Sequence, residues 1–191
     1  MRQDFSNVTD AQLSVLFPVL LEAHDPKWKE YYLQEKAFLQ SIFGDRIVRI
    51  NHIGSTAVDG LIAKPTIDIL LEVAEGTDLK DITESMKEEG YIVNMPGSDI
   101  IMYLKGYTPL GFQGQAVHIH VRRSGDWGEL YFRDYLSSHA GAAHEYAELK
   151  RSLKDRYPND RDGYTDAKSR FVQAYTERAR MAFPGRYMPD A

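Results

Sequence analysis

The alternation of apolar and polar positions predicts two β-strands joined by a loop in the first half of the chain. Arg46 to Ile53 is rich in β-branched residues that fall on alternate faces, which is typical of a strand. Thr66 to Val73 is a near-continuous run of β-branched residues and leucine, the pattern of a strand covered on both faces. The loop between them begins with Gly54-Ser55-Thr56 and leads into a short helix-like segment. We expect the rest of the chain to be organised around this unit.

Two helices are predicted before this unit. Thr9 caps the first, over Asp10 to Leu16. Asp25 is the N-cap of the second, with proline at its first helical position, and Gly44 ends it. The apolar face of the second helix is predicted to hold Trp28, Tyr31, Tyr32, Ala37, Phe38 and Ile42. Val19 to Ala23, between the two helices, is predicted to form a short strand.

A third helix is predicted after the second strand of the unit. Asp78 or Thr77 caps it, and Gly90 stops it after Glu89. Its inward-facing residues are predicted to be Leu79, Ile82 and Met86.

Further strands follow this helix. Tyr91 to Asn94 and Ile100 to Tyr107 are predicted strands, joined by a turn-rich loop over residues 95–99. Gly111 to Gln115 is predicted to be a loop. Ala116 to Arg123 alternates strictly, which places His118 and His120 on one face of a strand.

The pattern becomes helical after residue 125. Three helices are predicted, over Leu130 to Ser137, Ala140 to Tyr157 and Thr165 to Phe183. Strands followed by a run of helices favour an α+β fold, a mixed sheet flanked by helices with a C-terminal helical segment, over a doubly wound one. No linker marks a boundary, so we expect a single domain over residues 1–191, with a helical tail from about residue 126 that packs back on the sheet.

Composition narrows the class of protein. The chain has 191 residues, 43% hydrophobic and 27% charged, with a net charge of −5, so a nucleic-acid partner is not expected. The absence of cysteine excludes disulfides, thiolate catalysis and cysteine–zinc sites, and is consistent with a reducing cytoplasm. No segment is apolar enough to span a membrane, and the N-terminus lacks the apolar core of a signal peptide. No feature of the sequence indicates an oligomeric state.

Five short motifs, in order along the chain, resemble the signature of the GrpB family. The resemblance extends from about Val19 to Phe183. The motifs are His52-Ile53-Gly54-Ser55-Thr56-Ala57-Val58 with Gly60-Leu61 and Lys64-Pro65-Thr66-Ile67-Asp68-Ile69, then His118-Ile119-His120-Val121, Phe132-Arg133-Asp134-Tyr135-Leu136, Tyr146 with Leu149-Lys150, and Tyr164-Thr165 with Lys168 and Phe171.

This resemblance implies the nucleotidyltransferase fold of the DNA polymerase β superfamily, and relatives fused to dephospho-coenzyme A kinase. The superfamily pattern is a Gly-Ser pair, then a strand with two acids two residues apart, then a third acid on a neighbouring strand; the acids hold two Mg²⁺ ions over a nucleoside triphosphate. Gly54-Ser55 and Asp68 match the pattern. Leu70 stands at the position of the second acid, and the strand expected to carry the third acid offers His118 and His120.

The candidate site follows from these residues and the resemblance. Asp68 and His120 are the candidate catalytic residues, and Asp68, His118 and His120 the candidate metal ligands. An acid within an apolar strand is unfavourable unless it is paired or metal-bound. Imidazole favours Zn²⁺ or Mn²⁺ over Mg²⁺, and a nucleoside triphosphate is the expected co-substrate. The candidate phosphate-binding residues are Gly54, Ser55, Thr56, Lys64 and Arg122.

Each candidate also has a structural alternative. The Gly54 turn could be a tight turn alone, Lys64 a solvated charge, and Asp68 the acceptor of a structural hydrogen bond. A group of later cations could fold over the sheet and meet a phosphate or carboxylate, or could pair with Asp134 or Glu145. This group consists of Arg133, Lys150 and Lys168.

Two classes of function remain open. One is a nucleotidyltransferase-like enzyme that transfers a nucleotidyl or phosphoryl group to a small molecule with a divalent metal, Mg²⁺, Mn²⁺ or Zn²⁺. The other is a non-catalytic module that binds a nucleotide or coenzyme A in a degenerate active site. Leu70 favours the module, whereas Asp68 and the histidine pair favour the enzyme.

Overall fold

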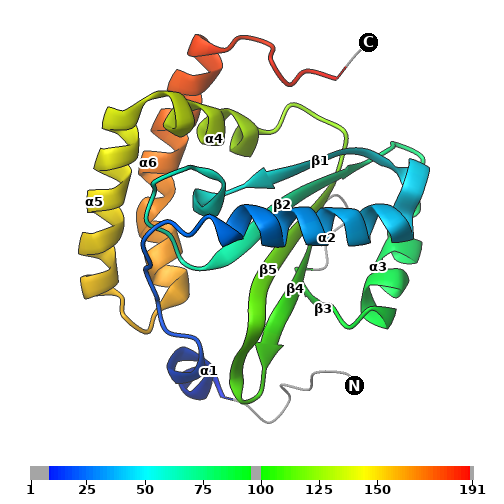
Figure 1. Cartoon of the computed structure of the whole chain (residues 1–191), viewed down its shortest axis with the longest axis horizontal. Helices are drawn as coiled ribbons and strands as arrows, with labels where there is room; N and C mark the ends of the chain where they lie inside the picture. Colours follow the sequence, from blue (N-terminus) through cyan, green and yellow to red (C-terminus); the bar gives the residue numbers. More distant parts are fainter. Residues whose placement is uncertain (1–8, 96–99, 190–191) are drawn as a thin grey trace.

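Among residues 9–95 and 100–189, which the computed structural model describes, five strands form one mixed sheet (Figure 1). They are β1 (Ile47–Ile53), β2 (Thr66–Val73), β3 (Ile92–Met95), β4 (Ile100–Thr108) and β5 (Gly111–Arg123), in the spatial order β1-β2-β5-β4-β3. β2 and β5 run parallel, and the other neighbours are antiparallel. The predicted α+β class is therefore confirmed.

The helices lie on different sides of this sheet. They are α1 (Asp10–Leu16), α2 (Lys27–Phe43), α3 (Leu79–Glu88), α4 (Gly128–Ser138), α5 (Ala140–Arg156) and α6 (Arg161–Ala182), with single 3₁₀ turns η1 (Gly44–Arg46) and η2 (Ser55–Ala57). Figure 1 shows α2 lying across the sheet, and α4, α5 and α6 grouped beside the β1 end of it. Within the described part of the chain, no helix has the length and apolar character needed to cross a membrane.

The main core fills the space between one face of the sheet and helices α2 and α3. Alternation along β2 and β5 directs their apolar residues to this face. The sheet residues buried there include Ile67, Ile69, Leu71, Val73, Val117, Ile119 and Val121, and the helix residues include Trp28, Leu39, Phe43, Leu79, Ile82 and Met86. Burial of this side leaves the opposite face of the same strands to carry their polar residues.

The C-terminal helices cover part of the opposite face of the sheet. A second core joins α4, α5 and α6 to the loop between β1 and β2; it includes Val58 and Leu61 of the loop with Tyr146 and Tyr175 of the helices. The N-terminal segment joins a third cluster, in which Val19 packs with residues of α5 and α6. The predicted packing of the helical tail against the sheet side is confirmed, whereas the single-domain organisation stays a prediction.

Most predicted elements are confirmed within one or two residues. The α1 capping box of Thr9 and Gln12 is present, Asp78 caps α3, and Gly44 ends α2 at a φ of 50°. The predicted N-cap Asp25 accepts a hydrogen bond from Lys27 N at 2.9 Å, so the second helix begins slightly later than expected. Residues 96–99 of the predicted loop lie outside the described residues.

Other predicted elements are wrong. Gly111 to Gln115 belongs to β5, because these residues continue the antiparallel ladder with β4 beyond the hairpin turn. Val19 to Ala23 reduces to one bridge between Glu22 and Ala63, since this segment packs on α5 and α6 rather than joining the sheet. The last helix begins at Arg161, four residues before the predicted start at Thr165.

The predicted apolar face of α2 also needs correction. Tyr31 and Ala37 are exposed, whereas the other predicted residues of this face pack in the main core: Trp28, Tyr32, Phe38 and Ile42. Glu35 is buried on the same face because the hydroxyl of Tyr91 and the amine of Lys105, at 3.0 Å, both donate to its carboxylate. The face is therefore mostly the predicted one, and it also includes the buried Glu35, Leu39 and Phe43.

Candidate active site

Asp68 lies at the centre of a polar cluster on the face of the sheet opposite the main core. It sits on β2, beside His118 of β5 in the parallel register. Asp68 Oδ1 lies 3.3 Å from His118 Nδ1 and 3.7 Å from His120 Nε2. Donor atoms of the three side chains all lie within 4.8 Å of one another. The structure thus brings together the three residues that the sequence proposed as metal ligands.

Neighbouring charge keeps the Asp68 carboxyl ionised. Burial by itself would raise its pKa, but the neighbouring imidazoles of His118 and His120 hold the pKa of that carboxyl well below its usual range. A buried carboxylate beside two imidazoles can serve either as a metal ligand or as their ion-pair partner. The cluster is therefore suited to bind a cation between its oxygen and the imidazole nitrogens.

The backbone of Gly54 packs closely against the Asp68 carboxylate. Its φ of 70° favours glycine, and a Cβ atom there would lie 2.4 Å from Asp68 Oδ2. The loop that follows is one 3₁₀ turn, Ser55–Ala57, rather than the start of a longer helix. The anion cradle expected at a helix N-terminus is accordingly limited to this single turn.

The Thr56 hydroxyl is used inside the loop. It donates to the Thr66 carbonyl at 3.0 Å and contacts His52 Nε2 at 3.0 Å, and the residue is 3% exposed. Because the hydroxyl proton goes to Thr66, His52 Nε2 is the donor in the second contact. Burial lowers the pKa of His52 to about 4, so this imidazole is neutral at pH 7. The threonine therefore braces the loop between the two strands.

Cations from three parts of the chain surround the cluster. Lys64 precedes β2, Lys150 is on α5, and Lys168 is on α6. Lys64 Nζ and Lys168 Nζ lie 5.2 and 4.4 Å from the ring centroid of Tyr164, a residue with no exposed surface. Arg161 of α6 donates to the Tyr107 hydroxyl at 3.1 Å, and that hydroxyl lies 2.7 Å from His118 Nε2.

The three lysines are held without a carboxylate of their own. Among residues 9–95 and 100–189, no ion pair joins any of them to an acidic side chain. Burial, and then the charges of neighbouring cations, lower the pKa of Lys64 to about 7 and that of Lys150 to about 7. Burial likewise lowers the pKa of Lys168 to about 8. Clustered, desolvated amines that form no ion pair are suited to bind an anion.

Lys150 makes the closest contact with the loop. It is 2% exposed, and its amine hydrogen-bonds to Ser55 Oγ at 3.1 Å and donates to the Ile62 carbonyl. Its Nζ also lies 4.6 Å from the ring centroid of Tyr146. Of the two alternatives for Lys150 and Lys168, folding toward the sheet is thus the one observed.

Other candidate residues lie elsewhere on the same face. Arg122 pairs with Glu129 at 2.6 Å, two strand positions beyond His120. Leu70 is buried against Ile53 and Leu130, so an apolar cluster fills the position where the superfamily pattern has its second acid.

Glu72, the other acid on this strand, has a structural partner. It has no exposed surface and forms a two-point ion pair with Arg49, with a distance of 2.7 Å between Arg49 Nη2 and Glu72 Oε1. Its Oε1 also accepts from Gly125 N at 3.1 Å. This carboxylate is therefore satisfied without a metal.

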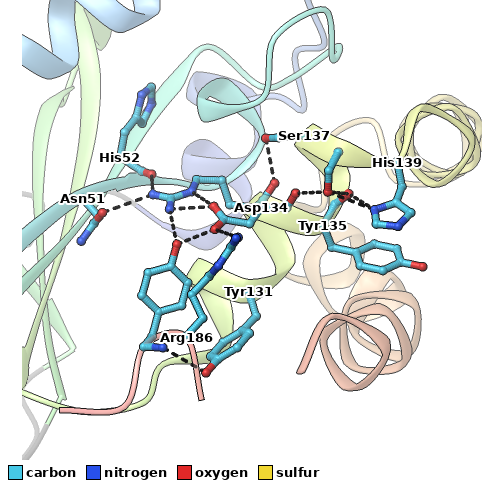
Figure 2. A network of polar contacts seen from close by, with 11 residues as sticks. Asn51, His52, Tyr131, Asp134, Tyr135, Ser137, His139 and Arg186 are labelled. Carbon is cyan, nitrogen blue, oxygen red and sulfur yellow. Dashed lines mark hydrogen bonds and ion pairs between the residues drawn. The ribbon is translucent and has the colours of Figure 1, made fainter. Parts of the chain in front are cut away.

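Arg133 joins α4 to β1 instead of facing the cluster. Its guanidinium donates to the His52 carbonyl at 2.9 Å and to Asn51 Oδ1 at 3.3 Å, and Figure 2 shows these two residues of β1 in one polar network with Asp134 of α4. It also donates to the Tyr187 hydroxyl at 2.9 Å and pairs with Asp134 at 2.8 Å. The expected pairing with Asp134 is present, and the network fixes the helical layer on the sheet edge.

Several residues of this site could not be assigned from the sequence. Tyr146 and Tyr164 stood in the motifs of the family resemblance but carried no predicted role. No sequence pattern indicated a role for Tyr107 or Arg161, because only the β4–β5 pairing and the position of α6 bring them close to His118.

The sequence is similar to a described protein family and to several known proteins. The family model described as "GrpB protein" matches residues 18–178. The glutamate-rich protein GrpB of Alkalihalophilus pseudofirmus is 35% identical over 161 residues, which are 81% of this chain and 91% of that protein. A dephospho-CoA kinase of Mycolicibacterium paratuberculosis is 26% identical over 187 residues, 85% of this chain but 46% of the kinase.

Solved structures show the same fold. The crystal structure of the conserved protein GrpB from Enterococcus faecalis superposes with a TM-score of 0.76 at 26% identity, over 86% of this chain and 99% of that one. The Cid1 poly(U) polymerase superposes with a TM-score of 0.50 at 14% identity, over 71% of this chain and 44% of that one. The predicted nucleotidyltransferase-like fold is confirmed by this second likeness, which concerns the fold alone.

Proposed function

The chain belongs to the GrpB family, and from that premise we propose that it binds a nucleoside triphosphate and transfers a nucleotidyl or phosphoryl group to a small molecule. A divalent metal at Asp68, His118 and His120 is part of the proposal. The observation that carries it is the group of buried lysines that form no ion pair, Lys64, Lys150 and Lys168, near the Asp68 cluster. A polyphosphate supplies the negative charge that these amines lack.

The donor set fits one metal ion better than two. Asp68 and the two histidines offer three ligand atoms close enough for a single ion, and the remaining positions are open to water or phosphate oxygens. Imidazole donors favour Zn²⁺ or Mn²⁺ over Mg²⁺. Because Leu70 is buried where a second acid would be needed, the residues do not fit a pair of Mg²⁺ ions. A bound ion would polarise the phosphate undergoing transfer.

The side chains have distinct roles in this proposal. Gly54, Ser55 and Lys64 contact the phosphates, and Lys168 of α6 neutralises the leaving group as charge develops on it. Asp68 orients the histidines and the metal. His120 is the proposed acid–base group, because its contact with Asp68 is the longer of the two and its other ring nitrogen has no hydrogen bond among the described residues.

A second candidate function is a non-catalytic module that binds a nucleotide or coenzyme A. The loss of the second acid at Leu70 favours it, as does the similarity to dephospho-CoA kinases, of which this chain spans about half. Coenzyme A carries phosphate groups that the same lysines could bind. In that case binding would depend on the cations and not on the Asp68 cluster.

Calorimetric titration of Mn²⁺ and Zn²⁺, with and without ATP, tests the proposal. Wild type should bind the metal, and ATP should bind more tightly in its presence. Asp68→Asn and His120→Ala should lose metal-dependent binding while remaining folded, whereas His139→Ala, an exposed histidine at the end of α4, should behave as wild type. ATP or coenzyme A binding that is equal with and without metal in all variants would support the module and contradict the enzyme.

A further inference from the structure

Ser55 has an unusual pair of neighbours for a loop serine. Its Oγ lies 3.1 Å from Lys150 Nζ and also shares a hydrogen bond with the Tyr146 hydroxyl. The serine is half-buried, while Lys150 and Tyr146 are 2% and 4% exposed. A serine hydroxyl between a desolvated lysine and a tyrosine is an arrangement in which lysine can act as a base.

The surroundings of Lys150 favour its neutral form. Its amine faces the Ile62 carbonyl, the Tyr146 ring and Ser55, with no carboxylate in contact among the described residues. The charged groups that act on it from neighbouring elements are Lys168 of α6 and Arg151 of α5, both of which lower its pKa, and burial lowers it further, to about 7. A neutral amine can donate to Ile62 and direct its lone pair toward the Ser55 hydroxyl.

Ser55 also lies next to the proposed metal and phosphate positions. Gly54, the preceding residue, backs directly onto Asp68 Oδ2. Lys150 and Lys168 are close enough for their charges to interact. A triphosphate bound beside Asp68 and Lys168 would therefore lie next to the serine hydroxyl.

We propose that Ser55 is itself an acceptor of the transferred group, with Lys150 as the base that removes its proton. This inference rests on the proposed function, because the donor is the nucleoside triphosphate bound at the same site. The Ser55 oxygen forms a bond to a phosphorus atom, and the bond from that phosphorus to the leaving phosphate oxygen breaks. The hydroxyl proton moves to the Lys150 amine. The products are nucleotidyl-Ser55 and pyrophosphate, or phospho-Ser55 and a nucleoside diphosphate.

The plainer role of Lys150 is to anchor the loop through the Ile62 carbonyl. The two roles differ in what an arginine at this position would do. Arginine keeps the positive charge and the hydrogen-bond donors, but it cannot take up a proton from serine. Lys150→Arg should therefore keep ATP binding and lose the modification, whereas an anchoring role alone would leave any modification unchanged.

The experiment is intact-mass and peptide mass spectrometry of the full chain after incubation with ATP and Mn²⁺. Wild type should gain the mass of one AMP or one phosphate on the peptide that contains Ser55. Ser55→Ala and Lys150→Arg should show no gain, and Ser137→Ala, an exposed serine on α4, should react as wild type. The rate in wild type should rise with pH from 6 to 8, because more of the Lys150 amine is then neutral.

The outcomes separate this inference from the proposed function. If calorimetry shows bound ATP but the mass does not change, or the adduct lies on another residue, the Ser55 inference is overturned and the proposed function stands. If Lys150→Arg is modified at the wild-type rate, Lys150 is not the base and the inference is likewise overturned. If ATP does not bind at all, both proposals fail.

Discussion

Replacing Lys150 with methionine should stabilise the free protein at pH 7 and weaken its binding to anions. The lysine side chain is 2% exposed and lacks a carboxylate partner in the described part of the chain. Methionine has a similar length and no charge, so it can fill the same space without the unfavourable burial of an ammonium group. The change therefore separates the stability of the site from its function.

The pKa of Lys150 gives the size of the effect. Burial lowers it from 10.5 to about 7, and at pH 7 this difference corresponds to about 4 kcal/mol of destabilisation of the folded state. Methionine also loses the hydrogen bonds to Ser55 and the Ile62 carbonyl, which costs about 2 kcal/mol. The net gain is about 2 kcal/mol, or a rise in Tm of about 4–8 °C for a chain of this size.

The effect should depend on pH in a defined direction. Since the folded-state pKa lies below that of the unfolded chain, the penalty is fully present below pH 7. It fades as pH rises from 7 toward 10.5, where both states are neutral. The advantage of Lys150→Met should therefore shrink with pH and reverse near pH 9, where the remaining penalty equals the cost of the lost hydrogen bonds.

Urea unfolding followed by tryptophan fluorescence at pH 7, 8.5 and 10 measures this difference. Lys154→Met, one turn further along α5, is the matched control and should change stability little at any of these pH values. A Lys150→Met protein that is less stable than wild type at pH 7, or an advantage that grows with pH, would refute the reasoning.

Gly54→Ala should destabilise the protein by about 1–3 kcal/mol and abolish Mn²⁺ binding. Gly60→Ala is the control, because Gly60 has a similar φ of 75° but open space around it; this variant should share only the backbone strain and keep Mn²⁺ binding. Equal Mn²⁺ affinity in the two variants would contradict this reasoning. The folded-state pKa of His52 is lowered to about 4, so the unfolded chain takes up the proton first and stability should fall by up to about 3 kcal/mol as pH drops from 6.5 to 4. Denaturation of wild type and His52→Gln across that range should show a weaker pH dependence in the variant. Glu72→Gln should cost about 3 kcal/mol, because it leaves Arg49 without its partner, and should leave Mn²⁺ titration unchanged if this acid is purely structural.

Local sequence determined the elements whose hydrophobic period is strong. Thr66–Val73 was predicted with its observed bounds because every residue of a doubly covered strand must suit burial, apart from those in the site. The start of α1 and the end of α2 were also predictable, since caps depend on contacts within a few residues. Gly111 to Gln115 was mispredicted because its glycines suggest a loop, whereas pairing with a distant strand makes it a strand.

The sequence also indicated part of the site. Asp68 and the histidines stood out because each is polar at a position where a strand residue ought to be apolar, and the period of two placed the histidines on one face. The meeting of Asp68 with His118 depended on the parallel register of β2 and β5, which no local pattern specifies. The family resemblance predicted that Asp68 belongs to a site, and the pairing of β2 with β5 brings it into contact with His118.

What the sequence determined by itself was the α+β class, most of the elements and the acidic centre of the site, because these follow from periodicity and from the cost of burying a charge. Only the tertiary structure decided which cations surround that centre. Lys150 and Lys168 lie on helices whose own pattern allows them to face solvent, an acid or the sheet. Their orientation is fixed by packing of α5 and α6 against the loop between β1 and β2, through contacts far apart in the chain. Side-chain burial of this kind is a property of the assembled layers, so it cannot be read from any one segment.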